Sequence, residues 1–185
     1  MIPRTHTQNT DWKHELRQAV TTPEELLDLL DLKKSRWLSA ARQSARLFPL
    51  KVPRGFIDRM QPGDIGDPLL RQVLPVDAEI QTDDSYSTDP VGDGPATAVP
   101  GLIHKYRRRA LVIATGACAV HCRYCFRRHF PYSQSFAGNS QLEAIEQYLR
   151  THTELNEVIL SGGDPLMLDN RQLGRLMQRL LSLIH

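Results

Sequence analysis

Cys118-Ala-Val-His-Cys122-Arg-Tyr-Cys125 is the stretch that decides how the chain is interpreted, because its eight positions hold all three cysteines of a 185-residue sequence. Structural cysteines scatter through a core, and disulfide scaffolds use even numbers of cysteines spread along a secreted chain. Neither pattern fits three clustered thiols. Thiolates brought together by one loop suit a soft metal centre, either zinc or an iron–sulfur cluster.

The two kinds of centre make different demands on the sequence. Structural zinc needs four ligands, so it would recruit His121 or His129 as the fourth. A [4Fe–4S] cluster held by three cysteines leaves one iron open for chemistry. The Cys-x3-Cys-x2-Cys spacing, with Tyr124 before the last cysteine, resembles the signature of radical S-adenosylmethionine enzymes. In those enzymes the open iron binds the amino and carboxylate groups of S-adenosylmethionine. We therefore predict an iron–sulfur cluster, with zinc as the alternative.

Composition indicates a soluble globular protein, with 41% hydrophobic and 24% charged residues. The longest charge-free apolar segment, Ala110 to Val120, is too short to cross a bilayer, and the first residues do not have the apolar core of a signal peptide. These features, and the oxygen sensitivity of such a cluster, predict a cytoplasmic, reducing location.

Positive charge is concentrated around the cysteines. No Asp or Glu occurs between Gly94 and Leu142, although seven of the 23 basic residues lie there: Lys105, Arg107, Arg108, Arg109, Arg123, Arg127 and Arg128. A basic run is typical of a solvated face or a nucleic-acid patch. Next to clustered thiols, we interpret it as a site for bound anions, namely a cofactor phosphate and two carboxylates.

The amino-terminal region, residues 1–75, is predicted to be helical. Thr22-Pro23-Glu24-Glu25 forms a reciprocal capping signal, followed by a buried face of Leu26, Leu27, Leu29 and Leu30, and a second helix is expected over Lys34 to Leu47. Residues 76–101 are rich in Asp, Ser, Thr, Pro and Gly, which predicts a linker, with plain disorder as the alternative for its middle.

Residues 102–185 show βα periodicity. Continuous apolar runs predict strands at 110–115 and 158–161. Ser140 opens a capping box for one helix, and Asp169 caps another whose apolar residues run to Ile184. The predicted fold class is α/β: an amino-terminal helical segment followed by two βα units with parallel strands, whose carboxyl ends carry the chemistry.

Several longer phrases resemble the lysine 2,3-aminomutase family of radical S-adenosylmethionine enzymes, and in particular its short bacterial branch, which makes (R)-β-lysine for modifying elongation factor P. They are Pro100-Gly-Leu-Ile-His-Lys-Tyr106, Cys125-Phe-Arg-Arg-His-Phe-Pro-Tyr132, Ser161-Gly-Gly-Asp-Pro-Leu166, Phe48-Pro-Leu-Lys-Val-Pro-Arg-Gly-Phe56 and Asp67-Pro-Leu-Leu-Arg-Gln-Val-Leu-Pro75. The resemblance implies a partial (β/α) radical-SAM barrel. Such a barrel needs about six βα units of roughly 30 residues each, whereas residues 107–185 suffice for two. We therefore expect a truncated, amino-terminal portion that is not active by itself.

The chemistry implied by the resemblance uses three cofactors. A [4Fe–4S] cluster on Cys118, Cys122 and Cys125 cleaves S-adenosylmethionine to a 5′-deoxyadenosyl radical. Pyridoxal 5′-phosphate holds lysine while its α-amino group migrates to the β-carbon. The family's imine-forming lysine belongs to the part not covered here, and none of the five lysines (Lys13, Lys33, Lys34, Lys51 and Lys105) has that position. No catalytic residue is therefore predicted within the chain.

The resemblance also implies roles for cofactor- and substrate-binding residues. Tyr124 would lie beside the adenine of S-adenosylmethionine, and Gly162 and Gly163 would admit its methionyl amino group. Asp164 would either hold that ammonium group or serve as a turn or cap residue. Arg127 would grip the substrate carboxylate.

Three further residues match family positions that contact pyridoxal phosphate: Tyr106, Arg109 and Lys105. The family usually has arginine where this chain has Lys105, which keeps the charge without a bidentate grip.

The implied partners are lysine as the small-molecule substrate, an electron donor such as a flavodoxin or ferredoxin, and, indirectly, elongation factor P through its modifying ligase. No membrane and no direct nucleic-acid contact is expected. Two alternatives remain: a radical aminomutase acting on another amino acid such as glutamate, and a zinc-stabilised nucleic-acid-binding module using Cys118, Cys122, Cys125 and His129. The low aromatic content of 6% argues against the latter, because it leaves few platforms for base stacking.

Overall fold

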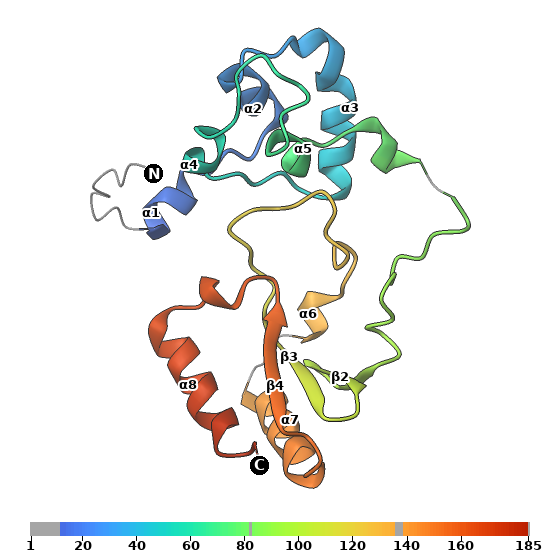
Figure 1. Ribbon diagram of the computed structural model, residues 1–185, viewed down its shortest axis with the longest axis vertical. Coiled ribbons are helices and arrows are strands. Elements are labelled where there is room, and N and C mark those ends of the chain that lie inside the picture. Colours follow the sequence, from blue (N-terminus) through green and yellow to red (C-terminus); the bar gives the residue numbers. More distant parts are fainter. Residues whose placement is uncertain (1–11, 82, 136–138, 185) are drawn as a thin grey trace. The chain divides into compact units, whose positions relative to one another are not determined.

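The computed structural model describes residues 12–81, 83–135 and 139–184. The described chain divides into two compact units (Figure 1). The first holds the residues up to Asp84 together with Ala119–Cys125, and the second holds Ser85–Cys118 together with Phe126 onward. The cysteine loop therefore divides between the units after Cys118.

The first unit is built from short helices around one apolar core. Its elements are α1 (Trp12–Arg17), α2 (Pro23–Leu29), α3 (Lys34–Leu47), α4 (Arg54–Ile57), α5 (Leu70–Val73) and the 3-10 turn η1 (Asp77–Ile80). The boundaries of α3 match those predicted from the sequence. The core gathers apolar side chains from the helices and their connections, including Val20, Leu26, Leu27, Leu30, Val52 and Leu70.

The start of α2 follows the predicted capping signal in part. Thr22 accepts a hydrogen bond from Glu25 N, and Pro23 occupies the first helical turn. The carboxylate of Glu25 bonds Arg54. The expectation that Leu29 is buried is wrong: its side chain is 44% exposed, because it lies away from the Leu26, Leu27 and Leu30 face. The apolar face of this helix is thus narrower than the leucine run suggests.

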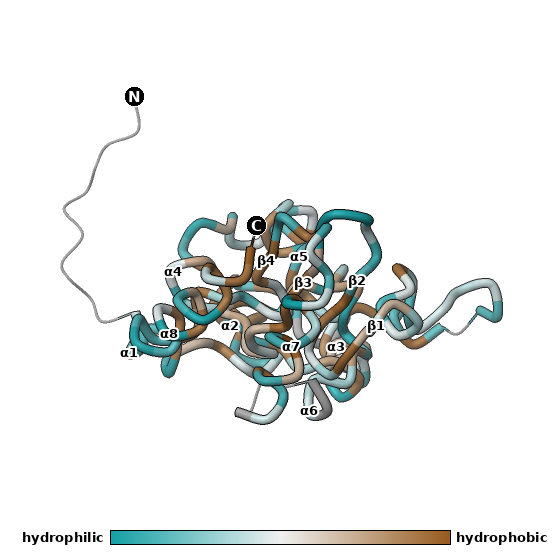
Figure 2. The backbone as a smooth tube through the Cα atoms, turned by 90° about the horizontal axis from the view of Figure 1, so that it is seen from below, coloured by the Kyte–Doolittle hydropathy of each residue, from teal (hydrophilic) through white to brown (hydrophobic). Residues whose placement is uncertain are grey.

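The second unit is organised by a four-stranded mixed sheet in the order β1-β2-β3-β4, formed by β1 (Thr97–Val99), β2 (Leu102–Tyr106), β3 (Arg109–Thr115) and β4 (Glu157–Gly162). The first three strands are antiparallel neighbours, and β4 pairs with β3 in parallel. Figure 2 shows the apolar character of β3 and β4. The parallel pair was predicted, whereas β2 was not. The strand β1 lies inside residues 76–101, for which a linker was expected.

Two helices share a core with one face of this sheet. They are α7 (Asn139–Thr151) and α8 (Asn170–Leu181), and they follow the shorter α6 (Tyr132–Ser135) and the 3-10 turn η2 (Pro165–Met167) respectively. Apolar residues of both helices pack on Leu102, Ala110 and Val112 of the sheet. The alternation of β3 thereby directs Ala110 and Val112 toward the helices.

Of the two predicted helix starts in this unit, the one before α8 is confirmed and the one before α7 is wrong. Asp169 caps α8 by accepting a hydrogen bond from Gln172 N through Oδ1, and Gln172 Oε1 accepts one from Asp169 N. The prediction that Ser140 stands before α7 is wrong, since α7 already begins at Asn139. Likewise α8 ends at Leu181, so Ile184 follows the helix. Within the described residues, no helix combines the length and apolar character needed to span a membrane.

Candidate functional site

The cysteine loop leaves the carboxyl end of β3. None of the three cysteines forms a disulfide and each has intermediate exposure, and cysteine thiolates are the donors that hold an iron–sulfur cluster. Cys118 belongs to the second unit, and Cys122 and Cys125 belong to the first. Across the described ranges, no three His, Cys, Asp or Glu side chains gather in metal-ligand geometry. The cysteines are thus candidate ligands by their donor type and spacing.

Arg123 fastens the Cys122–Cys125 segment to the first unit. This side chain is only 8% exposed. Its Nε donates to Glu79 Oε1 (2.9 Å) and its Nη2 to Glu79 Oε2 (2.6 Å), while Nη1 donates to the carbonyl of Phe48 (2.7 Å). The backbone N–H of Arg123 also donates to the carbonyl of Gln72 at 2.8 Å. A bidentate, buried pair of this kind fixes both the position and the orientation of the segment.

The residues on either side of Cys122 and Arg123, His121 and Tyr124, also contact the first unit. His121 Nδ1 lies 3.0 Å from the carbonyl oxygen of Pro49. Burial lowers the pKa of His121, with the charges of Lys51 and Arg123 acting in the same direction and the bond to Pro49 opposing them. Tyr124 is 69% exposed, and its hydroxyl donates to Gln72 Oε1 at 3.2 Å. The neighbouring side chain of Cys122 raises the pKa of Tyr124, first by its electrostatic effect and then by a hydrogen bond. The ring of Tyr124 is accessible, as contact with an adenine would require.

Gly163 and Asp164, the two residues that follow β4, fasten the stem of the loop just before Cys118. Gly163 N donates to the carbonyl of Thr115 (2.7 Å), and Asp164 N donates to that of Ala117 (2.8 Å). Gly162 has φ +114°, and a Cβ on either glycine would lie 2.3 Å from a carbonyl oxygen, that of Thr115 or that of Ala117. Both glycines are therefore required by backbone packing within the protein itself. Asp164 caps η2 by accepting from Leu166 N.

Arg127 is the most enclosed of the predicted ligand-binding side chains. Its Nε donates to Asp93 Oδ2 and its Nη1 to Ser161 Oγ, both at 2.7 Å. Its guanidinium carbon stands 4.9 Å from the ring centroid of Phe126 and 6.0 Å from that of Phe130. Residues from the loop before β1, the end of β4 and the segment after Cys125 thus converge on one cation.

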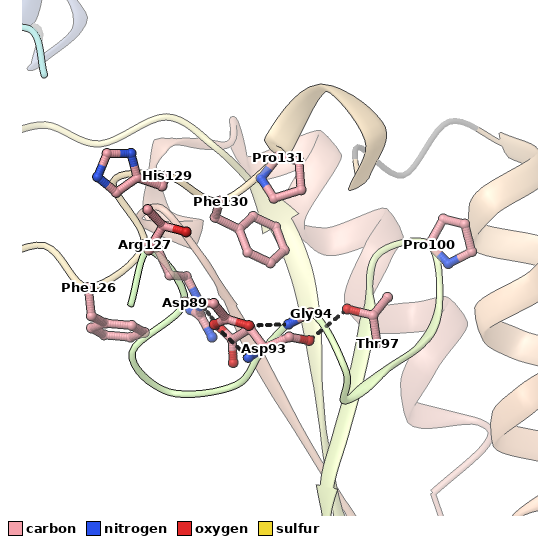
Figure 3. Close-up of a pocket in the computed structure, with 11 residues that line it drawn as sticks. Asp89, Asp93, Gly94, Thr97, Pro100, Phe126, Arg127, His129, Phe130 and Pro131 are labelled. Atoms are coloured by element: carbon pink, nitrogen blue, oxygen red, sulfur yellow. Dashed lines mark hydrogen bonds and ion pairs between the residues drawn. The ribbon is translucent and has the colours of Figure 1, made fainter. Parts of the chain in front are cut away.

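A cavity of about 410 Å³ opens beside Arg127, as Figure 3 shows. Its lining combines aromatic rings (Phe126 and Phe130), charged groups (Arg127, Asp89 and Asp93) and His129. A cavity of this size suits a small molecule, and its arginine suits a carboxylate.

The other residues expected to bind cofactor lie in two places. Lys105 forms an ion pair with Asp93, as Arg127 does. Tyr106 and Arg109 are paired residues beside the β2–β3 turn, at the opposite end of β3 from Thr115. Tyr106 is 55% exposed, and Arg109 forms an ion pair with Glu157. The structure thus brings Lys105 and Arg127 together through one carboxylate and places Tyr106 and Arg109 elsewhere.

Asp93 holds its charge despite being 2% exposed. Burial by itself would raise the pKa of Asp93. Hydrogen bonds from Lys105 and Arg127, together with their positive charges, outweigh burial and lower the pKa below its ordinary value. The carboxylate therefore stays ionised at neutral pH and can hold both cations.

Sequence reasoning missed the structural roles of Asp93 and Arg123. Asp93 lies among small and polar residues in the predicted linker, and Arg123 was counted with the other basic residues as part of an anion site. The Gly92-Asp93-Gly94 sequence gives only a turn signal. The sequence offers one further indication, which is that Asp93 directly precedes the acid-free stretch that begins at Gly94.

Comparison with known proteins supplies the remaining observations. Residues 107–184 match a family model described as a 4Fe-4S single cluster domain. The chain is 46% identical to the L-lysine 2,3-aminomutase of Escherichia coli K12, over 95% of this chain and 51% of that protein. It is 42% identical to the one of Buchnera aphidicola (95% and 52%) and 28% identical to the one of Clostridium subterminale (95% and 42%). The chain thus spans about half the length of the curated relatives it matches.

Proposed function

We propose that this chain is part of a radical S-adenosylmethionine, pyridoxal-phosphate-dependent lysine 2,3-aminomutase that converts L-α-lysine to (R)-β-lysine. One observation carries the proposal: three cysteines in Cys-x3-Cys-x2-Cys spacing, none of them in a disulfide, occur in a chain that is 46% identical, over 95% of its length, to an L-lysine 2,3-aminomutase. The match of residues 107–184 to a 4Fe-4S domain favours iron over zinc.

The donor set fits the cluster. Cys118, Cys122 and Cys125 would hold it, and when bound it would supply the electron that cleaves S-adenosylmethionine. The chain's own residues orient these ligands: the bonds of Gly163 and Asp164 set the stem before Cys118, and Arg123 sets the segment between Cys122 and Cys125. Arg127, beside the cavity of about 410 Å³, would bind the carboxylate of the amino-acid substrate.

Pyridoxal phosphate fits the described residues less completely. Of its three expected contacts, only Lys105 lies near Arg127, and it does so through Asp93. The similarity to L-lysine 2,3-aminomutases supports this cofactor, and the residue that binds it covalently would come from outside this chain.

The proposed cellular setting follows from the proposed reaction. A flavodoxin or ferredoxin in the cytoplasm would reduce the cluster. The product would serve a ligase that modifies elongation factor P. The 46% identity to the E. coli relative, against 28% to that of C. subterminale, supports placement in the short bacterial branch.

The test begins with anaerobic reconstitution by ferrous iron and sulfide. A brown protein with about four irons per chain is expected, and changing any one of the three cysteines to serine should abolish it. The complete protein of which this chain is a part, loaded in the same way, is then given S-adenosylmethionine, pyridoxal phosphate, reductant and ¹³C-labelled L-lysine, with L-glutamate in a parallel reaction. β-Lysine is the expected product. Uptake of zinc alone, or conversion of glutamate in place of lysine, would overturn the assignment.

A further inference from the structure

Asp93 connects two cations that the family resemblance assigns to different ligands. Oδ2 of Asp93 accepts from Arg127, and Oδ1 pairs with Lys105. The positive charges of Lys105 and Arg127 therefore share the single negative charge of Asp93. Together the three groups carry a net charge of +1. The side chains of Arg127 and Asp93 are 7% and 3% exposed, and that of Lys105 is 20% exposed. Solvent screens the interactions among them only weakly.

The loop that carries Asp93 is itself held in place. Asp89 accepts from Asp93 N through Oδ1 and from Gly94 N through Oδ2, both at 2.8 Å. Thr97 Oγ1 donates to the carbonyl of Asp93, also at 2.8 Å (Figure 3). The backbone N–H, the carbonyl and the side chain of Asp93 are thus all engaged. A carboxylate fixed in this way can set the direction of a guanidinium that bonds it.

The two cations differ in their relation to the cavity. Arg127 and Asp93 line it, and Lys105 is not among its lining residues. Arg127 paired with Asp93 alone would present a neutral couple to the cavity. Lys105 offsets the charge of Asp93, so Arg127 is not neutralised by its own partner. Asp89, the other acid of the lining, has both carboxylate oxygens bonded by the backbone N–H groups of Asp93 and Gly94.

We propose that Asp93 and Lys105 are positioning residues for Arg127: Asp93 aims the guanidinium at the cavity, and Lys105 neutralises Asp93 so that Arg127 retains its affinity for a carboxylate. The inference rests on the proposed function for the identity of the ligand, the carboxylate of L-lysine. It gives Lys105 an indirect role, without contact with a bound phosphate.

The test is a double-mutant cycle on L-lysine binding, measured by calorimetry on the complete protein of which this chain is a part. Asp93→Asn should weaken binding about tenfold, the size of a lost charge-assisted hydrogen bond. Lys105→Gln should weaken it severalfold, and Lys105→Arg should retain it. Because Lys105 acts through Asp93, adding Lys105→Gln to Asp93→Asn should cause no further loss. An additive loss would show that Lys105 touches the ligand directly and would overturn the inference.

Lysinamide, which lacks the carboxylate, serves as the control ligand, and neither variant should change its affinity. Glu146→Gln, which removes a carboxylate from the ion pair with Arg179 between α7 and α8, is the matched control variant and should leave L-lysine binding intact. If Asp93→Asn does not fold, the Lys105→Gln and Lys105→Arg pair decides, since equal affinities in these two would also overturn the inference.

Failure of the inference differs from failure of the proposed function. Binding of L-lysine that depends on its carboxylate and on Asp93, without formation of β-lysine, would remove the function and leave the inference. Formation of β-lysine with an additive cycle would do the reverse. A wild-type protein that binds L-lysine no better than lysinamide would refute the role of Asp93 and Lys105.

Discussion

The stem of the cysteine loop and the Cys122–Cys125 segment are held by different chemistry. The stem, just before Cys118, is held by main-chain hydrogen bonds from Gly163 and Asp164 within the second unit. The Cys122–Cys125 segment is held within the first unit by the buried ion pair of Arg123 with Glu79, in addition to the main-chain bond from Arg123 N to the carbonyl of Gln72. The main-chain bonds at the stem require that Gly163 has no Cβ. The side-chain bonds of Arg123 require that its charge is paired with that of Glu79.

This difference predicts different sensitivities to substitution. At the stem, the smallest possible change, glycine to alanine, already collides with a carbonyl oxygen. At the Cys122–Cys125 segment, size matters less than the presence of both charges, because a buried charge without its partner is costly. Each fastening can be broken separately, since each lies within one unit.

Arg123→Met should have the largest effect on stability. It leaves the carboxylate of Glu79 in a site where its side chain is only 10% exposed, and breaking such a pair typically costs about 3–5 kcal/mol. Both tryptophans, Trp12 and Trp37, belong to the first unit, so urea unfolding followed by tryptophan fluorescence reports on that unit. Iron uptake in reconstitution should fall in parallel.

Two controls separate charge from packing at Arg123. Arg54→Met removes an exposed partner of Glu25 and should cost less than about 1 kcal/mol. Adding Glu79→Leu to Arg123→Met should recover part of the loss, because no buried charge remains unpaired. If the double variant is as unstable as the single one, the fastening depends on the shape of Arg123 and not on its charge.

Gly163→Ala should have the next largest effect. A Cβ there would lie 2.3 Å from the carbonyl oxygen of Ala117, and relieving such overpacking costs about 1–3 kcal/mol. The loss should be local: the amides of Gly163 and Asp164, which donate to Thr115 and Ala117, should exchange faster with deuterium. Iron uptake should also fall, because the stem before Cys118 shifts. Unchanged exchange at these two amides would mean that the main-chain fastening is not a constraint.

The predictions that succeeded rest on local patterns. The boundaries of α3, the Asp169 cap of α8 and the parallel strands β3 and β4 follow from periodicity and capping within a few residues. The order of the strands could not be predicted in this way. The strands β1 and β2 are short, and their residues, such as Thr97 and His104, do not alternate clearly between polar and apolar. A hairpin with few apolar residues is stabilised mainly by the sheet it joins.

The sequence predicts candidate ligands by their residue types, but it does not indicate which acids pair with the cations of the candidate site. Cysteine spacing predicted the ligands, and the acid-free stretch predicted bound anions. The structure instead pairs several of its cations with acids outside or at the edge of that stretch: Arg123 with Glu79, Arg127 with Asp93, and Arg109 with Glu157. The first two pairs join residues 44 and 34 positions apart. No pattern in a single sequence specifies such partners.

Acid should weaken the ion pairs of Asp93, whereas hydrogen bonds between main-chain groups do not depend on pH in this range. The pKa of Asp93 is lowered in the folded protein, so its ionised form contributes stability at pH values above its unfolded pKa of about 3.9. This contribution is lost as pH falls through the lower folded value. The difference in unfolding free energy between wild type and Asp93→Asn should therefore be constant from about pH 5 to 7 and should shrink below about pH 4. Glu146→Gln provides the matched comparison away from the cavity. A difference between wild type and Asp93→Asn that persists in acid would assign the effect to packing.

The smallest effect should come from Gly174→Ala, which tests whether glycine is required wherever it occurs in the second unit. Gly174 lies inside α8, and a Cβ there would meet nothing within 4 Å. Alanine loses less conformational entropy than glycine on entering a helix, so this variant should be more stable by about 0.5–1 kcal/mol. Chemical denaturation followed by circular dichroism measures the gain. The same substitution would then have opposite signs at Gly163 and Gly174, because only Gly163 faces a carbonyl oxygen at the stem of the loop. A loss of stability at Gly174 would mean that α8 packs more tightly than its contacts indicate, and it would remove the contrast on which the interpretation of Gly163 depends.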